Sequence, residues 1–134
     1  MKAVAEAERG NGNMKFILYS AKHAEGKRLN ENWGSLTWLG NPQIGNLKDM
    51  TVGRVVIKKG HSNPRHAHGN CEELLYLLKG KLEHTMGSEK IILNPGDTLT
   101  VAPGVFHNAL SVGEEDADMM VCYSSGTRDF QPEK

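Results

Sequence analysis

The chain has 134 residues, about the length of one domain, and can bury a workable core without disulfides. Sixteen Lys and Arg residues balance sixteen Asp and Glu residues, so the formal net charge is zero and no large field attracts nucleic acid or an anionic membrane. We expect neither as a partner. The two cysteines, Cys71 and Cys122, are too few for a disulfide scaffold and too far apart for a CxxC motif, which favours a reduced, cytoplasmic setting.

The first 32 residues are polar and contain one short apolar run, Phe16–Tyr19. That run is far too short for a signal-peptide core or a membrane span, so we expect a soluble chain that is not exported. We predict that residues 1–32 form a loosely ordered N-terminal arm and that residues 33–134 form a single domain. Disorder is one interpretation of the arm, and a strand added by Phe16–Tyr19 to a partner subunit is the other.

Beyond residue 50 the chain changes to short runs rich in Val, Ile, Leu and Thr, separated by Gly, Pro or Asn. Dipeptides such as Lys79-Gly80 and Pro103-Gly104 supply the backbone angles that tight turns need. Many short antiparallel strands in one small domain indicate an all-β sandwich, jelly roll or closed barrel, because these architectures manage exposed strand edges. The expected strands cover residues 50–58, 72–78, 81–86, 90–93, 98–102, 107–112 and 117–124.

Two of the six histidines, His66 and His68, stand two residues apart. On a strand, successive side chains alternate between faces, so both imidazoles point the same way and lie about 6.6 Å apart along the strand. Glu72 and Glu73 follow after a short loop, and only one of them can face the same interior once the next strand begins. The six-residue gap to Gly80 favours Glu73 as the carboxylate of a shared site.

This layout resembles the cupin superfamily in both of its signature motifs. The first motif is Gly, five residues, His-x-His, three or four residues, Glu, six residues and Gly, and here every position is filled, by Gly60, His66, His68, Glu73 and Gly80. The resemblance covers residues 50–124.

The second motif of the family appears as Gly96, Pro103, Gly104 and His107. Pro103 lies one place later than in the family pattern, although the distance from Gly96 to His107 is preserved. The pattern also has an Asn four residues after the histidine, whereas here Asn108 follows His107 directly. Neither departure changes any of the three histidines or Glu73.

The resemblance implies a jelly-roll β-barrel, also called a double-stranded β-helix, in which His66, His68, Glu73 and His107 bind one divalent transition metal. Three neutral imidazoles and one carboxylate suit Mn, Fe, Co, Ni, Cu or Zn better than Ca or Mg. The sequence does not choose among these metals.

A metal held in this way can polarise a carbonyl, stabilise an enolate or lower the pKa of a bound water. We therefore predict a metal-dependent enzyme that acts on a small oxygenated or carbonyl compound. The reaction is either dioxygen chemistry or an isomerase or lyase step through an enolate, because the fold fixes neither reaction nor substrate. The alternative is a non-catalytic, metal-containing module that binds a small molecule.

Two further residues, His84 and Arg54, are predicted catalytic residues. Strand alternation places His84 on the expected interior face, where its imidazole can exchange a proton with a substrate; a hydrogen-bonded core histidine is the alternative. The sequence does not fix the face of Arg54, which either binds a substrate carboxylate or lies on the solvated barrel wall. Whether Cys71 or Tyr123 lines the pocket is left open.

Small cupins commonly pair, and we predict a homodimer whose interface uses the segment Trp33–Asn41 and the N-terminal arm. Trp33 and Trp38 mark the start of packed structure, as core or interface anchors. The near-continuous apolar run Leu74–Leu78 indicates a modest, largely apolar pocket, which disfavours a bulky phosphosugar as the substrate.

Overall fold

The computed structural model describes residues 5–10 and 13–134 and contains two large β-sheets. The strands of the first sheet are β3 (Leu29–Glu31), β4 (Gly34–Gly40), β5 (Thr51–Ile57), β7 (Glu73–Lys79), β10 (Thr98–Val101) and β12 (Ala117–Tyr123). Those of the second sheet are β6 (His66–Ala67), β8 (Leu82–Met86), β9 (Glu89–Leu93), β11 (His107–Ser111) and β13 (Gln131–Pro132).

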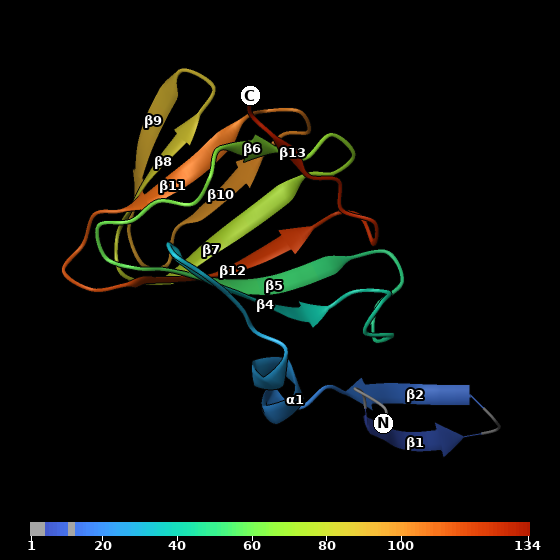
Figure 1. Cartoon of the computed structure of the whole chain (residues 1–134). Coiled ribbons are helices and arrows are strands. Elements are labelled where there is room, and N and C mark those ends of the chain that lie inside the picture. Colours follow the sequence, from blue (N-terminus) through green and yellow to red (C-terminus); the bar gives the residue numbers. More distant parts are fainter. Residues whose placement is uncertain (1–4, 11–12) are drawn as a thin grey trace.

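The two sheets face each other and enclose the core of a barrel (Figure 1). Their strand orders are β10-β7-β12-β5-β4-β3 and β13-β6-β11-β8-β9, and the paired strands run antiparallel. The chain crosses repeatedly from one sheet to the other, for example between β5, β6 and β7. This arrangement confirms the predicted all-β jelly roll. Each of the seven predicted strands is present, with ends within one residue of those expected.

The interior of the barrel is filled by alternate residues of the strands. Along β12 every second side chain, from Ala117 to Tyr123, is buried between the sheets. Ile57, Leu77 and Leu82 are each fully buried in the same core. Burial of one such side chain stabilises the fold by about 1.5–3 kcal/mol, so a strand whose sequence alternates with period two turns its apolar face inward.

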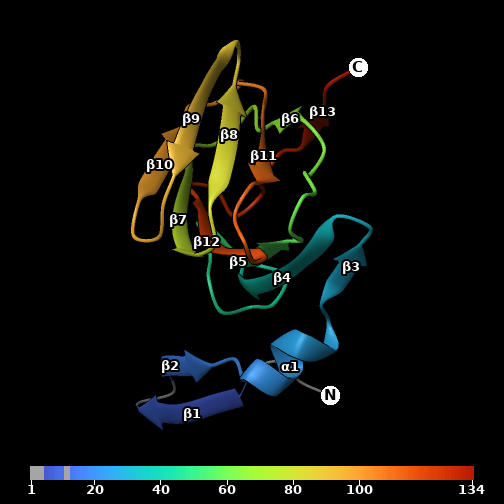
Figure 2. The same ribbon diagram turned by 90° about the vertical axis from the view of Figure 1, so that its left-hand side faces the viewer.

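The N-terminal arm lies outside the barrel (Figure 2). It contains a hairpin of β1 (Ala5–Gly10) and β2 (Asn13–Leu18), followed by α1 (Ala21–Gly26). Of the segment Phe16–Tyr19, for which a strand added to a partner subunit was one interpretation, the first three residues belong to β2, which pairs with β1 of the same chain. The helix was not predicted, because six residues are too few to show a helical period; the Ser20 hydroxyl caps it by accepting a hydrogen bond from the backbone N–H of His23 at 3.2 Å.

The arm and the barrel are joined through β3, which pairs with β4 in the six-stranded sheet. The six-stranded sheet of the barrel therefore begins at Leu29, inside the segment predicted as the arm. The division of the chain into residues 1–32 and 33–134 stays a prediction.

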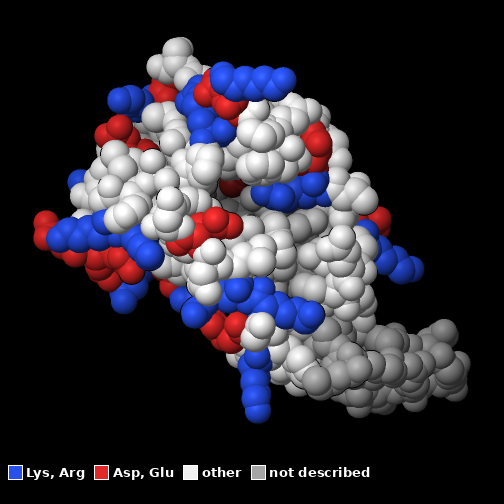
Figure 3. Space-filling model, in the orientation of Figure 1, with Lys and Arg blue, Asp and Glu red and all other residues white. Residues whose placement is uncertain are grey.

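Charged side chains of both signs are interspersed over the face of the molecule shown in Figure 3. This mixture accords with the zero net charge of the sequence and gives that face no patch of a single sign. Within the residues that the structure describes, no helix has both the length and the apolar character that a membrane crossing requires.

Candidate metal centre

Three histidines and one glutamate from distant parts of the sequence meet inside the barrel. One potential ligand atom from each of His66, His68, Glu73 and His107 lies within 4.8 Å of the others. All four residues are buried, with exposed fractions of 7%, 2%, 4% and 2%. The structure therefore brings together the four residues that the sequence predicts as metal ligands.

The local structure explains how these four residues reach one point. His66 and His107 are directly paired residues of the neighbouring strands β6 and β11, and their ring centroids lie 4.5 Å apart. His68 lies one residue beyond the end of β6, and Glu73 begins β7. The short strand β6 thus ends before His68, in contrast to the predicted strand through both histidines, yet both imidazoles point into the barrel.

The turn before His107 connects the two predicted motifs. Gly104 has a φ of +80°, a conformation that glycine adopts at little cost, and its backbone N–H donates to the carbonyl oxygen of His68 at 2.9 Å. This hydrogen bond holds the turn that delivers His107 against the loop that carries His68. The glycine of the second motif is therefore explained by backbone geometry.

Each histidine of the cluster is oriented by a backbone carbonyl. The distances from Nδ1 to the carbonyl oxygen are 2.7 Å for His66 and Pro64, 2.7 Å for His68 and Asp129, and 2.9 Å for His107 and Val105. Because a carbonyl oxygen can only accept, Nδ1 carries the proton in all three rings. Each Nε2 therefore presents a lone pair to the interior of the cluster, which is the arrangement of metal-binding histidines.

The carboxylate of Glu73 lies between two of these rings. Its Oε1 is 3.1 Å from Nε2 of His68 and 3.1 Å from Nε2 of His107. The contact with His107 has hydrogen-bond geometry, whereas Nε2 of His68 is buried without a hydrogen-bond partner among the described residues. Two nitrogen lone pairs facing one carboxylate need a cation between them, so this donor set fits a metal ion.

The pKa values of Glu73 and His66 agree with such a role, whereas that of His107 in the metal-free protein is shifted towards the protonated form by the adjacent Glu73 carboxylate. Burial by itself would raise the pKa of the Glu73 carboxyl, but its contacts with His107 and His68 outweigh burial and hold that pKa well below its usual range. Burial also tends to lower the pKa of His107, but the Glu73 carboxylate raises it above its ordinary value. Burial lowers the pKa of His66 to about 4, so this ring is neutral at pH 7. An ionised carboxylate and neutral imidazole are the forms that bind divalent metals.

His84, one of the two predicted catalytic residues, lies beside the cluster. Its side chain is 1% exposed and stacks on the ring of His107, with ring centroids 5.6 Å apart. Burial lowers the pKa of His84 to about 4, and its Nδ1 has no hydrogen-bond partner within the described part of the chain. Whether His84 acts in the reaction or is a core histidine stays a prediction.

Arg54, the other predicted catalytic residue, lies on the outer face of β5. Its guanidinium donates to both carboxylate oxygens of Asp118 on the adjacent strand β12, at 2.8 and 2.5 Å. The side chain is 45% exposed. The structure does not bring Arg54 to the cluster, because even-numbered positions of β5 point away from the barrel interior. Its position gives no support to a role in binding substrate.

Two cavities lie next to each other at the cluster. The inner one has a volume of about 30 Å³ and is lined by His66, Glu73, His84 and His107 among others. The outer one has a volume of about 260 Å³ and reaches the molecular surface. Four residues line both cavities, namely Val55, Asn63, His66 and Tyr123. The outer cavity is therefore the approach to the cluster.

Residues at the C-terminal end of the chain complete the site, and sequence reasoning missed them. Strand β13 pairs with β6, and the Asp129 carbonyl preceding it orients His68. The ring of Phe130 stacks on His66 with centroids 4.8 Å apart. Arg128 lines the outer cavity beside Tyr123. The segment has no hydrophobic period and no motif, so no signal in the sequence marks it.

Cys71 and Tyr123, whose places the sequence leaves open, are both buried in the core. Tyr123 lines both cavities, and burial raises the pKa of its hydroxyl group above the usual value. Burial likewise raises the pKa of the Cys71 thiol. Glu72, the carboxylate that spacing disfavours, is exposed.

Comparison with protein families identifies the fold and the motif. The model described as the cupin domain matches residues 53–123, which is more than half of the chain. The chain belongs to the cupin family. The matched range contains all four residues of the cluster and thus agrees with the geometry of the site.

Curated relatives of this cupin are distant. Oxalate oxidase 2 of Hordeum vulgare is 28% identical over 124 residues, which cover 81% of this chain and 54% of that protein. An uncharacterized protein of Methanocaldococcus jannaschii is 24% identical over 82 residues, or 61% of this chain and 66% of that protein. The chain spans about half the length of the oxalate oxidases it matches.

Solved structures share the fold at low sequence identity. An oxalate decarboxylase variant from Bacillus subtilis superimposes with a TM-score of 0.79 at 15% identity, covering 94% of this chain and 35% of that one. An uncharacterized protein with a double-stranded β-helix domain from Klebsiella pneumoniae gives a TM-score of 0.71 at 19% identity, with 87% and 97% covered. These likenesses establish the barrel.

Proposed function

We propose that His66, His68, Glu73 and His107 bind one divalent transition metal. The observation that carries this proposal is the convergence of three Nε2 lone pairs on a buried carboxylate, with each Nδ1 fixed by a backbone carbonyl. Mixed nitrogen and oxygen donors suit Mn, Fe, Co, Ni, Cu or Zn, and the identity of the ion is a matter for measurement.

Elemental analysis of protein purified without added metal tests this proposal. We expect close to one transition metal ion per chain, and its loss in the variants His66→Ala and His107→Ala. His61→Ala is the matched control, because His61 is exposed and lies outside the cluster. Unchanged metal content in both cluster variants would refute the assignment.

We further propose that the protein is an enzyme that acts on a small oxygenated or carbonyl compound. A divalent ion in this site would supply a Lewis acid that polarises a carbonyl or lowers the pKa of water. The chain itself keeps this chemistry away from bulk solvent, since the ligands are at most 7% exposed and the outer cavity provides the approach. The distant relatives named as oxalate oxidases support a reaction of a small oxygenated compound, by dioxygen chemistry or through an enolate.

The position of His84 supports a role for this residue in the reaction. Its neutral ring lines the inner cavity beside His107, and Nδ1 has no partner in the described part of the chain. A neutral imidazole can donate or accept one hydrogen bond at each nitrogen, so it is suited to orient a small molecule in this cavity or to exchange a proton with it. His84→Phe should lower kcat while metal content stays unchanged.

A screen for activity tests the proposed reaction class. Oxygen uptake is measured for the Fe and Mn forms with oxalate, catechol, flavonol and β-diketone substrates, and carbon dioxide release is measured in parallel. Uptake that disappears in His107→Ala would select dioxygen chemistry. Carbon dioxide release without uptake would select a lyase step.

The alternative is a non-catalytic cupin that holds a metal and a small molecule. Turnover distinguishes this alternative from an enzyme. Saturable binding of a small carboxylate with no product formed over many protein equivalents would favour the binding module.

A homodimer remains our proposal for the assembly, with a revised interface. Trp33 and Trp38 pack against the core, whereas Leu74, Tyr76 and Leu78 on the outer face of β7 are 41%, 39% and 46% exposed. Contiguous exposed apolar side chains are typical of protein contacts. Size-exclusion chromatography with light scattering should give twice the chain mass, and Leu78→Glu should give the monomer.

The predicted cytoplasmic location is retained on the basis of two free thiols, Cys71 and Cys122.

A further inference from the structure

The guanidinium of Arg128 is surrounded by aromatic rings. Its central carbon lies 5.0 Å from the ring centroid of Trp38, 4.9 Å from that of Tyr123 and 5.2 Å from that of Phe130. Such contacts orient an arginine and remove water from part of its surface. They leave its positive charge without a compensating negative one.

No carboxylate of the described residues forms an ion pair with Arg128. Its Nε is buried and has no hydrogen-bond partner within that part of the chain. The adjacent Asp129 is engaged elsewhere, since its carboxylate accepts from the Gly69 backbone and the Gln131 amide. A partly buried cation that lacks a carboxylate partner within the described residues is suited to bind an anion from outside.

Arg128 also lies beside the approach to the metal centre. It lines the outer cavity together with Trp33, Leu36, Phe130 and His66. Apolar and aromatic side chains thus form most of the wall, and His66 lies at the inner end. The volume of about 260 Å³ is below the range that accommodates drug-sized ligands, so the cavity fits a small molecule.

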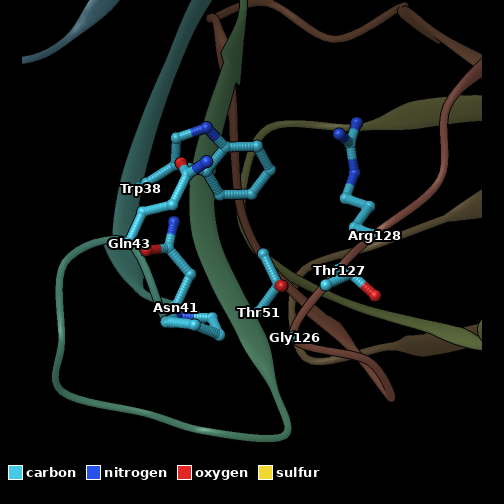
Figure 4. Close-up of a pocket in the computed structure, with 8 residues that line it drawn as sticks. Trp38, Asn41, Gln43, Thr51, Gly126, Thr127 and Arg128 are labelled. Atoms are coloured by element: carbon cyan, nitrogen blue, oxygen red, sulfur yellow. The ribbon is translucent and has the colours of Figure 1, made fainter.

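Arg128 also lines a second hollow, which has a volume of about 390 Å³. Figure 4 shows Trp38, Asn41 and Gln43 along one side of this hollow and Thr51, Thr127 and Arg128 along the other. None of the four cluster residues lines it, so a ligand there would not reach the metal centre.

We infer that the outer cavity binds a small carboxylate with an apolar or planar body, and that Arg128 recognises its carboxylate while the body lies between Trp33, Leu36 and Phe130. This inference rests on the proposed function, because it names the substrate class of the same site. A ligand held in this way extends from Arg128 towards His66.

Benzoate and its neutral analogue benzyl alcohol are suitable probes. The two tryptophans of the chain report on binding, because Trp33 lines the cavity and Trp38 contacts Arg128. Binding is followed by tryptophan fluorescence and checked by calorimetry with metal-bearing protein. We expect benzoate to bind at least about 10-fold more tightly than benzyl alcohol, since hydrogen bonds to a charged group are worth this much.

Arg128→Met should raise the Kd for benzoate about 10- to 100-fold and change that for benzyl alcohol less than about twofold. Arg128→Lys should restore part of the benzoate affinity, because it keeps the charge but loses the bidentate fork. Arg54→Met is the matched control and should bind both probes as the unaltered protein does. Equal losses for both probes in Arg128→Met, or no loss, would overturn the inference in favour of a packing role.

Two more variants decide which cavity the ligand occupies. Phe130→Ala should weaken benzoate binding, whereas Gln43→Ala, in the hollow of Figure 4, should not. The opposite result would overturn the proposed location, as would the absence of any benzoate binding at millimolar concentration.

A double variant separates the test of carboxylate binding from the test of metal binding. The Arg128→Met change is repeated in the His107→Ala protein, because His107 does not line the outer cavity. The same relative loss of benzoate affinity there supports the carboxylate site whether or not the cluster binds metal. Metal content, measured on every variant, reports independently on the proposed metal centre.

Discussion

The two ends of the barrel interior differ sharply although the same strands build both. Strand β7 begins with Glu73 in the cluster and buries Leu77 towards its other end, while β12 buries Ala117 at one end and Tyr123 at the other. One end is packed with apolar side chains, and the other gathers nitrogen and oxygen donors. Buried polar groups cost free energy unless they are paired, so a cluster of this kind lowers the stability of the fold unless a bound ion pairs with it.

The largest expected effects come from removing one side chain from each end of the barrel interior. Leu77→Ala should lower the free energy of unfolding by about 2–5 kcal/mol, because it leaves a cavity in a fully buried position. His107→Ala should weaken metal binding by about 100-fold or more, since it removes a ligand and not merely a supporting hydrogen bond. Chemical denaturation and competitive chelator titrations measure the two quantities.

The two ends of the barrel would not have separate roles in stability and metal binding if these outcomes were exchanged. Metal loss in Leu77→Ala under conditions where the variant is folded would show that the ends are coupled. Full metal occupancy in His107→Ala would show that the four-residue cluster is not the metal-binding site.

An intermediate effect is expected from pH in the metal-free protein. Burial lowers the pKa of His66 and of His84 from 6.5 to about 4. Between pH 6.5 and 4 the unfolded chain therefore binds more protons than the folded one, so stability falls as the pH is lowered through that window. The loss should be about 3 kcal/mol for each histidine, and it is measured by denaturation at a series of pH values.

His84→Phe sharpens this prediction, because it removes one titrating ring and leaves a side chain of similar shape. The variant should lose less stability than the unaltered protein between pH 6.5 and 4. His61→Gln, at an exposed position, serves as the control and should follow the unaltered curve. Identical pH profiles for all three proteins would contradict the buried neutral state of His84.

The smallest effect belongs to the outer surface. Arg54→Met breaks the ion pair with Asp118, in which the Arg54 side chain is 45% exposed and the Asp118 side chain 17%. The variant should lower the free energy of unfolding by less than about 1 kcal/mol. Metal content and any activity should stay unchanged. A loss of turnover in this variant with normal stability would restore the catalytic role that the sequence suggested for Arg54.

The sequence was informative where local rules apply. Alternation and turn residues predicted the seven strands from β5 to β12 apart from β6, and the position of Gly80 predicted Glu73, not Glu72, as the inward carboxylate. The face of Arg54 was not predictable, because β5 is apolar on both faces around Gly53 and offers no clear alternation. Its outward position follows from the register that pairs Val55 with Met119 in the core.

The C-terminal residues show the limit of such reasoning. Asp129 orients His68 from 61 positions away, and Phe130 covers His66. Neither residue stands at a recognisable spacing from the histidines, since both reach the site through the pairing of β13 with β6.

The sequence by itself determined the all-β class, seven of the barrel strands and the four residues of the cluster, because alternation, turn chemistry and motif spacing are properties of the chain that can be read without the fold. The tertiary structure decided the protonated nitrogen of each ring, the neutral His84 beside His107, and the unpaired Arg128 at the approach to the cluster. These features depend on which backbone carbonyls, rings and charges meet across the barrel, and such contacts join residues that have no fixed separation in the sequence.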